Sequence, residues 1–564
     1  MKIPDDLIDG PEGRAAFYDA VVKQCLLSRN DRFDFYQTMR NYYLFGASDE
    51  MIGCDYNKIG STIETLSSFI YSPDNVKFSI HLGTTADPAT NLPKVRPLAK
   101  DVNDHWRATD TNRLFGMAIP WALTYGCTLF KCVWHYGKQI PQVYLLEPHM
   151  FGVYQENISA LDQQQAVVHL YSISTAELYA KLEGDSRRER IMARVGYKGG
   201  GGQGDVFGEA MSRLVFNTGP GGTGTAGQIL KGQGGSIAGG LGGGGSYDYT
   251  PRQNEETVTM MELWIWDDDL NDYRTVTIAE PNVVIYDRPN IGIKGMLPFV
   301  KLAPEHNLYD YFWDESFVAR LVRLQDWRTI RIIEIRDLLG KQVNPPKSLS
   351  GFSGIAEEKM LAMNRAGGLI SSPIPGSKMD VHAPQVPIDV FREVERIDAM
   401  FDDMAGINHV LQGKGESGVR SRGQADLMAR LGSARPKRRA INVEESAADL
   451  ATLMLRMIQQ HSKQKFTAEG AQPNGEPLIF IPNQFTTDFE VRVDGHSSSP
   501  IFVEDRKNDA THLLEAGAID RETLLEWFDP PEVQILQAKL KIREAKEAEQ
   551  AKMAQLQGEG NAKK

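Results

Sequence analysis

The chain has 564 residues, of which 41% are hydrophobic and 24% charged, and its formal net charge is −12. This length allows about two to four domains with sizeable cores. No run approaches the ~18 consecutive apolar residues of a membrane span, and the start MKIPDDLIDG lacks a charged-then-apolar signal segment. We therefore expect a protein made in the cytoplasm and used there, or in something assembled there. The acidic balance argues against tight nucleic-acid binding, which needs clustered Lys and Arg.

Four cysteines are too few for a disulfide framework in a chain of this size. Cys127 and Cys132 lie in GCTLFKCVWHY, which reads as a strand. Their odd separation puts them on opposite faces of that strand, so they neither pair nor chelate a metal together. Buried, reduced thiols are the prediction.

The first 150 residues mix helices and strands. The amphipathic pattern at 59–72 predicts a helix, with Ser61 and Glu64 as a capping box. Residues 95–126 also read as helical, with a kink near Pro120. The segments CTLFKCVWHY and QVYLLEP then predict strands.

Residues 199–246 differ in character, because they hold about 20 of the 52 glycines. Such a segment buries too little apolar surface to offset its ordering entropy. A phosphate-binding role would need a strand before it and a helix after it, and neither is evident. We interpret it as a mobile surface insertion.

An antiparallel meander is predicted next, with strands at 257–266, 273–279 and 282–287. Its first turn, Asp267-x-Asp269-x-Asn271, resembles the opening of a calcium loop. The sixth position is Asp272 instead of Gly, and the twelfth is Ile278 instead of Glu. A solvated hairpin turn is therefore favoured over a metal site.

The middle of the chain begins with one long helix at 314–340, which Asp314 caps and Gly340 ends. It would span roughly 39 Å. Arginines occur along its whole length: Arg320, Arg323, Arg328, Arg331 and Arg336. Pro345 and Pro346 prevent it from continuing.

A compact Gly-, Pro- and Ser-rich segment follows at 341–387, with a short helical piece at 356–364. Pro387 opens a second helix at 388–405, whose apolar residues follow three-and-four spacing, and Gly406 ends it.

The chain then enters a third helix through a Gly-rich, basic loop. Ser421 and Gln424 can cap this helix, which bends around Gly432 and Pro436 and resumes at 440–461. Strands are predicted within 478–493. A helical tail is predicted at 502–564, with disordered final residues.

The loop LQGKGESGVRSRGQA contains a literal G-x-G-x-x-G, from Gly413 to Gly418. A dinucleotide-binding loop follows a strand, whereas this one follows a helix. A P-loop needs G-x-x-x-x-G-K-[ST], but Lys414 precedes Gly415. The H-R-D and D-F-G motifs that accompany a kinase glycine loop do not occur. A nucleotide site is therefore strongly disfavoured.

Other enzyme signatures are missing too, because the sequence has no H-E-x-x-H, G-x-S-x-G or C-x-x-C. Its 11 histidines are scattered, and adjacent acids such as Asp402-Asp403 point about 100° apart on a helix. We expect no catalytic residues, no cofactor and no metal.

The order of elements in the middle of the chain resembles the bacteriophage portal protein, or head-to-tail connector, of the short-tailed (podovirus) type. The resemblance rests on DYFWDESFVARLVRLQDWRTIRIIEIR and MFDDMAGINHVLQGKGESGVRSRGQADLMARL, with ALTYGCTLFKCVWH in support. It covers roughly residues 50–545 and lies in element order and local pattern. The insertion at 199–246 departs from it.

The resemblance implies an α+β subunit of several domains with long stem and wing helices. The implied parts are a wing at 1–310 and 422–500, stem helices at 311–340 and 388–405, a clip at 341–387, a channel (tunnel) loop at 406–421, and a helical crown and tail at 501–564. The wing would contain the insertion in its first part, and a long kinked helix with strands in its second.

The implied function is a ring, generally of about twelve subunits, at one capsid vertex. Double-stranded DNA would pass through it during packaging and ejection. The implied partners are other copies of the chain, viral DNA in transit, a terminase packaging motor, a tail adaptor, and major capsid and scaffolding proteins. The implied location is the virion, with the host cytoplasm during assembly. An acidic ring would discourage DNA from adhering.

Two sets of basic residues are the candidate contacts. In the channel loop, Lys414, Arg420 and Arg422 would touch DNA phosphates, although plain solvated loop charges explain them equally well. In the clip, the candidates for motor or adaptor contact are Lys341, Lys347, Arg365 and Lys378. The competing functions are a nucleotide-binding enzyme that uses the 413–418 loop, and another virion scaffold or head–tail adaptor.

Overall fold

The computed structural model describes most of the chain before residue 195 and several long segments after it. These are residues 14–47, 57–72, 76–83, 88–195, 257–280, 282–290, 292–343, 347–350, 378–382, 387–407, 434–468, 478–482, 489–493 and 512–517, with isolated positions besides. Several predictions lie outside them, among them the insertion at 199–246, the short helix at 356–364, the Ser421–Gln424 capping box, and the tail beyond 517.

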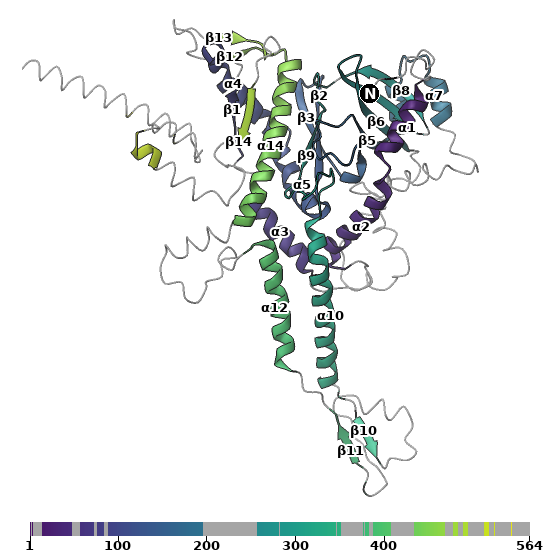
Figure 1. Ribbon diagram of the computed structural model, residues 1–564, viewed down its shortest axis with the longest axis vertical. Helices are drawn as coiled ribbons and strands as arrows, with labels where there is room; N and C mark the ends of the chain where they lie inside the picture. Colours follow the sequence, from purple (N-terminus) through teal and green to yellow (C-terminus); the bar gives the residue numbers. More distant parts are fainter. Residues whose placement is uncertain are drawn as a thin grey trace, which may run out of the picture.

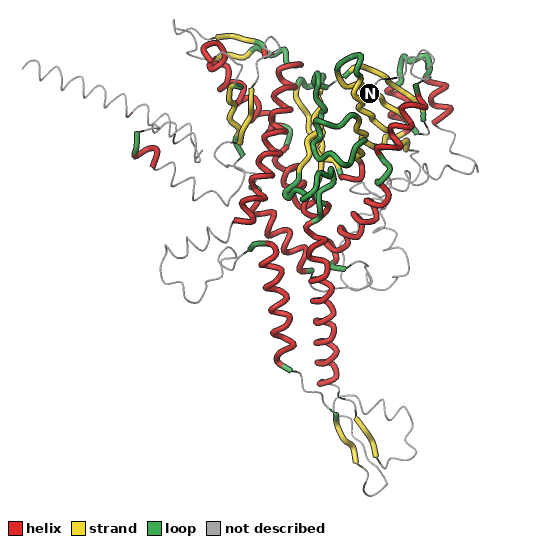
Figure 2. The backbone as a smooth tube through the Cα atoms, in the orientation of Figure 1, coloured by secondary structure: helices red, strands yellow, loops and turns green. Residues whose placement is uncertain are grey.

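A broad body carries a narrow stem (Figure 1). The stem consists of helix α10 (Phe317–Val343) and helix α12 (Ile388–Ala405), which pack against each other. At its far end lie two short paired strands, β10 (Lys347–Ser350) and β11 (Lys378–Val381). The chain thus runs out along α10, turns, and returns along α12 (Figure 2).

A five-stranded antiparallel sheet forms one side of the body, in the order β4-β5-β6-β7-β8. The strands are β4 (Phe151–Val153), β5 (Ala166–Ser174), β6 (Thr257–Asp267), β7 (Asp272–Ala279) and β8 (Val283–Pro289). The predicted meander is therefore confirmed. The turn after Asp267 is a hairpin: Asp267 accepts a hydrogen bond from the backbone N of Asp269 and pairs with Arg274.

A three-stranded sheet lies beside it, in the order β3-β2-β9. Its strands are β2 (Thr128–His135), β3 (Ile140–Leu146) and β9 (Phe299–Leu302). The two cysteines of this region are confirmed as free and buried. Cys127 packs in the core between the two sheets and Cys132 in the large helical core, as expected for opposite faces of a strand.

Most helices of the body surround the large core: α2 (Arg29–Phe45), α3 (Lys58–Ile70), α4 (Pro88–Ala108), α5 (Thr111–Tyr125) and α14 (Ala434–His461). Helix α1 (Ala15–Cys25) packs in a second core with the five-stranded sheet, and α6 (Thr175–Lys181) and α7 (Arg188–Val195) pack in a third. Helix α14 packs on α3, α4, β2 and β9, so it joins the second half of the chain to the first.

Further strands link distant parts of the sequence. Strand β1 (Phe78–Leu82) pairs with β14 (Phe489–Val493), so segments from near both ends of the chain share one ladder. Strands β12 (Phe466–Ala468) and β13 (Leu478–Phe480) form another pair. All described pairings are antiparallel, and together with the helices they confirm the predicted α+β fold class.

Several predicted helix ends were wrong. Helix α3 begins one turn earlier than its expected capping box, because the side chain of Asn57 accepts the capping hydrogen bond from the N of Gly60. Ser61 lies inside the helix and donates to the carbonyl of Lys58 instead.

The helix predicted at 95–126 is two helices. The break falls between α4 and α5, where Asp110 has a left-handed backbone with φ of 56°. Pro120 lies inside α5. Because Asp is among the few residues that tolerate this backbone, the break lies at the polar ATDTN and not at the proline.

Helix α10 also differs at both ends from the prediction. Ser316 caps it, since its Oγ accepts from the N of Ala319 at 3.2 Å. The Asp314 carboxylate instead accepts a hydrogen bond from the N of Asn307 and forms an ion pair with Lys301. The helix passes Gly340 and ends at Val343. The predicted bounds of α12 are confirmed, with Gly406 in the left-handed conformation after its last residue.

Helix α14 begins six residues before the predicted resumption at 440. Pro436 therefore lies in its first turn, where the missing N–H breaks no helical hydrogen bond. Whether a helix precedes it at 421–433 lies outside the described residues.

Candidate functional site: the stem and its junction with the body

Two arginines of α10 reach across to α12 and hold the stem together. Arg328 Nε lies 2.7 Å from a carboxylate oxygen of Asp398. Arg331 contacts Glu393 at 3.2 Å and Glu334, on its own helix, at 2.6 Å. The Arg328 side chain is only 6% exposed, whereas Asp398 is 34% exposed. The first pair is therefore the stronger tie, because water screens it less.

Apolar side chains remain exposed along both stem helices. Ile330 is 54% exposed and Ile333 is 40% exposed on α10, and Phe391 is 43% exposed on α12. Trp327, Leu339 and Val343 add to this surface. Two antiparallel helices have too few neighbours to bury such residues, so the stem carries apolar surface that a single copy leaves open.

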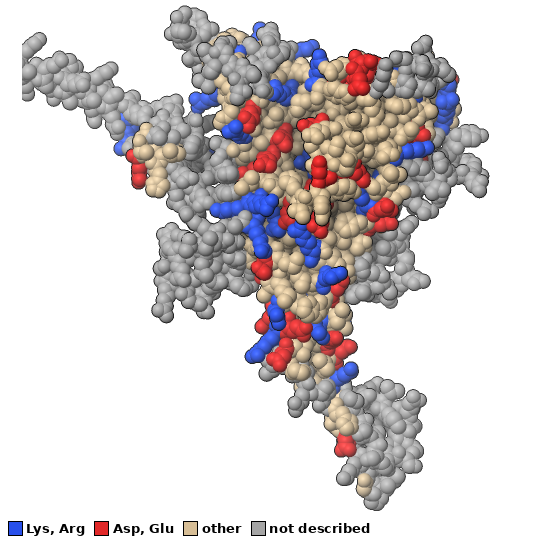
Figure 3. Space-filling model, viewed as in Figure 1, with Lys and Arg blue, Asp and Glu red and all other residues tan. Residues whose placement is uncertain are grey.

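The surface of the stem also carries charges of both signs (Figure 3). Arg392 and Asp389, for example, form a pair at 3.7 Å in which both side chains are largely exposed. An exposed pair of this kind contributes little to the fold of one copy. The stem thus combines apolar and charged groups on surfaces that face away from its own core.

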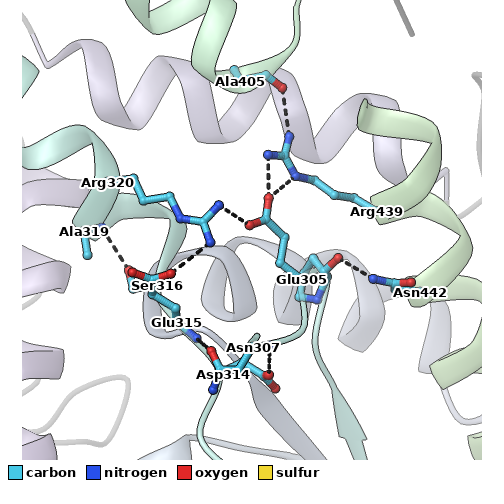
Figure 4. A network of polar contacts seen from close by, with 11 residues as sticks. Glu305, Asn307, Asp314, Glu315, Ser316, Ala319, Arg320, Ala405, Arg439 and Asn442 are labelled. Atoms are coloured by element: carbon cyan, nitrogen blue, oxygen red, sulfur yellow. Dashed lines mark hydrogen bonds and ion pairs between the residues drawn. The ribbon is translucent and has the colours of Figure 1, made fainter. Parts of the chain in front are cut away.

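Glu305 joins the stem to the body through two arginines (Figure 4). One oxygen of its carboxylate lies 2.6 Å from Arg320 of α10, and the other lies 2.5 Å from Arg439 of α14. Arg439 is 7% exposed, and burial lowers its pKa, while the neighbouring Glu305 opposes that shift. Glu305 therefore holds the start of α10 against the start of α14.

The end of α12 meets the same place. Arg439 Nη1 donates to the carbonyl of Ala405, and Arg435 Nη1 donates to the carbonyl of Asp403, each at 2.8 Å. Both arginines thereby stabilise the negative end of the α12 dipole. A Cβ at Gly406 would lie 3.0 Å from the Cβ of Arg435, so these two positions touch. The chain leaves α12 and enters α14 at neighbouring points.

A separate buried cluster ties the two sheets together. Lys131 of β2 lies 2.6 Å from Glu262 of β6 and 3.4 Å from His169 of β5. Burial, with the nearby Lys131 charge, pushes the pKa of His169 well below its usual value, so this histidine is neutral. Glu262 also accepts from the Trp264 indole. Every charge here has a partner, which fits a structural role.

The structure separates the predicted clip residues that it describes. Lys341 is an exposed residue in the last turn of α10. Lys347 pairs with Val381, and Lys378 pairs with Ser350, at opposite ends of the β10–β11 ladder. Arg365 lies outside the described residues, as do Lys414, Arg420 and Arg422 of the predicted channel loop.

Sequence reasoning missed the junction residues. Ser316 had a local signal, because a serine just before a helix is a common cap. The Glu305–Arg439 pair had none, since 134 positions separate its members and only the tertiary fold brings them together.

The described part of the chain shows neither a metal-binding cluster nor a membrane-spanning helix. Within it, no three His, Cys, Asp or Glu side chains are placed to hold a metal ion. None of the described helices is both long and apolar enough to cross a membrane.

No protein-family model matches the sequence, and no curated protein matches it significantly. Among solved structures, the chain is similar to a component of a native gene transfer agent virion, with 9% identity and a TM-score of 0.41, over 88% of this chain and 93% of that one. It is similar to a component of the neck of an empty gene transfer agent particle, with 8% identity and a TM-score of 0.40, over 87% and 92%. Likenesses below a TM-score of 0.5 give no basis for assigning a function.

Proposed function

We propose that this chain is the subunit of a portal ring, the channel at one capsid vertex through which double-stranded DNA is packaged and ejected. In this proposal the body is the wing, α10 and α12 are the stem, and β10–β11 belongs to the clip. The packaging motor and the tail adaptor would dock at the clip. ATP hydrolysis would belong to the motor.

The observation that carries the proposal is the open surface of the stem. Ile330, Ile333 and Phe391 are exposed in one copy, and exposed apolar residues on a rigid helix pair favour association. Copies are proposed to associate head to tail, each covering the exposed stem residues of its neighbour with a different face of its own stem. A head-to-tail interface that closes on itself makes a ring.

The contacts where α10, α12 and α14 meet are consistent with the proposed channel loop. Residues 407 and 434 lie close together because Gly406 touches Arg435, and Glu305 ties α10 to α14 at the same place. The described residues therefore hold both ends of the segment 408–433 at one place, as the proposed channel loop requires. Lys414, Arg420 and Arg422 of that segment are proposed to contact DNA phosphates transiently.

The alternatives make different predictions for the purified protein. A nucleotide-binding enzyme would bind ATP or NAD saturably and would not need a ring. A head–tail adaptor could form a ring, but it would not be needed for DNA to enter the capsid. For the portal, the partners are proposed to be the motor, the adaptor, the capsid and scaffolding proteins, and the location to be the virion.

Two measurements on the full-length protein test the proposal. Light scattering should give a mass of many copies, and a packaging reaction without the chain should yield empty capsids. A monomer that binds ATP or NAD saturably would overturn the portal function. Normal DNA content in capsids that lack the chain would favour the adaptor.

A further inference from the structure

A small cavity lies in the body, away from the stem and the junction. It is lined by one face of α2, the end of α5 and the segment that begins the short 3-10 helix η1 (Pro148–Met150). The lining residues are Phe33, Tyr36, Gln37, Arg40, Tyr125, Glu147 and His149. Its volume is about 20 Å³, which admits roughly one oxygen-sized group, since a water needs about 10–15 Å³.

Two aromatic pairs pack against each other in the walls of this cavity. The Phe33 ring packs edge-on against the His149 ring at 5.4 Å, and Tyr36 packs edge-on against Tyr125 at 5.3 Å. The residues from α2 follow helical spacing, so they share one face of that helix. The cavity is therefore formed by side chains that the fold holds in place.

His149 presents a polar atom without a partner. Its side chain is 5% exposed, and its Nε2 makes no hydrogen bond to any described residue. A buried polar nitrogen without a partner is costly, so a ligand atom at this position would be favourable. The other ring nitrogen, Nδ1, lies 3.3 Å from a Glu147 oxygen.

The surroundings of the cavity are positively charged. Burial lowers the pKa of His149 to about 3, and the charges of Arg29, Arg32 and Arg40 add to that shift. The acids at this place are Glu147 and Glu156, the latter 3.7 Å from Arg32. Three cations against two acids leave an excess of positive charge even when both acids are ionised. Arg40 lines the cavity, is exposed, and has no ion pair with a described residue.

We propose that this cavity binds one oxygen of a small oxyanion of the phosphate or carboxylate class. The oxygen accepts a hydrogen bond from His149 Nε2–H, and the rest of the anion lies at the mouth of the cavity against the Arg40 guanidinium. Arginine suits this position because its planar fork matches phosphate and carboxylate oxygens. The site is independent of the proposed ring.

Binding should take up a proton. In the neutral imidazole of His149, a hydrogen on Nε2 leaves Nδ1 without one. Nδ1 can then accept a hydrogen bond from Glu147 only if that carboxyl is protonated. The charged and titratable groups around Glu147 are Arg40 from α2, Tyr125 from α5 and His149 from η1. Burial raises the pKa of Glu147 to about 7, which Arg40 partly opposes. The anion should therefore bind better at pH 6 than at pH 8.

The test is thermal unfolding and calorimetric titration of the full-length protein with sodium phosphate and, separately, sodium acetate. Sodium chloride keeps the ionic strength constant. We expect a saturable rise in melting temperature, larger at pH 6 than at pH 8. The anion that binds more tightly shows whether the site prefers a phosphate or a carboxylate.

Two variants and a control complete the test. Arg40→Gln removes an exposed charge and should fold normally, and His149→Phe keeps an aromatic ring while removing Nε2. Each should weaken binding about tenfold or more, because a hydrogen bond to a charged group is lost. Arg392→Gln removes a 74% exposed arginine of α12 and should change nothing. An equal effect of chloride, or unchanged binding in both variants, would overturn the proposal.

Discussion

Arg328 of α10 and Asp398 of α12 form the more buried of two ion pairs that join the stem helices, with 2.7 Å between Nε and a carboxylate oxygen. They are 70 positions apart and lie on opposite sides of the turn through β10 and β11. The pair fixes how the outgoing and returning helices align. The shape of the stem depends on that alignment.

Asp398→Asn should therefore destabilise the chain by about 1–2 kcal/mol, because Arg328 stays buried without its full counter-charge. Asp389→Asn, on the same helix, is the matched control. Asp389 is 89% exposed and its partner Arg392 is 74% exposed, so its loss should cost less than about 0.5 kcal/mol. Urea unfolding followed by circular dichroism measures both. If both variants lose the same free energy of unfolding, the Arg328–Asp398 pair contributes no more to stability than an exposed pair.

Glu305→Gln should cost more, about 2–4 kcal/mol, because Arg439 is 7% exposed and loses its only carboxylate among the described residues. Glu315→Gln is its control. Glu315 pairs with the same Arg320, but it is 61% exposed. If the Glu305 pair is the link between stem and body, only Glu305→Gln should also increase cleavage by protease near residue 434. Indistinguishable cleavage in the two variants would argue against that link.

Glu147 should make stability depend on pH. Burial raises the pKa of this carboxyl to about 7 in the folded chain, from a usual value of 4.5. Between these values the folded state holds a proton that the unfolded state has released, so stability falls as pH rises from about 4.5 to 7. The full effect is on the order of 3 kcal/mol.

Glu147→Gln should remove this dependence, because Gln resembles the protonated acid. In phosphate-free buffer, the variant should be more stable than the natural chain at pH 8 and similar to it at pH 4.5. Glu177→Gln, whose side chain is 50% exposed, is the control. If the stability of the natural chain and that of the Glu147→Gln variant change with pH in parallel, Glu147 is not the cause of the pH dependence.

The boundaries of α12, the meander and strand β2 could be predicted from the sequence, because each depends on local periodicity and on residues such as Gly406. The start of α10 could not, because Asp314 is a plausible cap until Asn307 and Lys301 engage it. The break at Asp110 had a signal in the polar ATDTN, but the proline at 120 is the stronger helix breaker in isolation. Long-range pairs such as Glu305–Arg439 leave no local pattern.

Ile330→Ser should weaken association between copies while leaving the single chain folded. Ile330 is 54% exposed in one copy, so its loss costs the isolated fold little. If a neighbouring stem covers it, each interface loses about 1 kcal/mol. Leu270→Ser, at a 41% exposed residue in the β6–β7 turn, is the control. Light scattering over a dilution series should show earlier dissociation for Ile330→Ser alone.

Replacing Lys414, Arg420 and Arg422 together by Ala should leave assembly intact and reduce the DNA that capsids package or retain. These residues are proposed to touch phosphates, whose binding depends on positive charge. The DNA content of purified particles is the measurement. Unchanged DNA content would leave the three residues as solvated loop charges.

Negative-stain electron microscopy of the purified full-length protein distinguishes a portal ring from a single subunit. A portal subunit should give closed rings with a central opening and with narrow stems that project together to one side. Single elongated particles at every concentration, with the shape of one copy, would contradict the portal function.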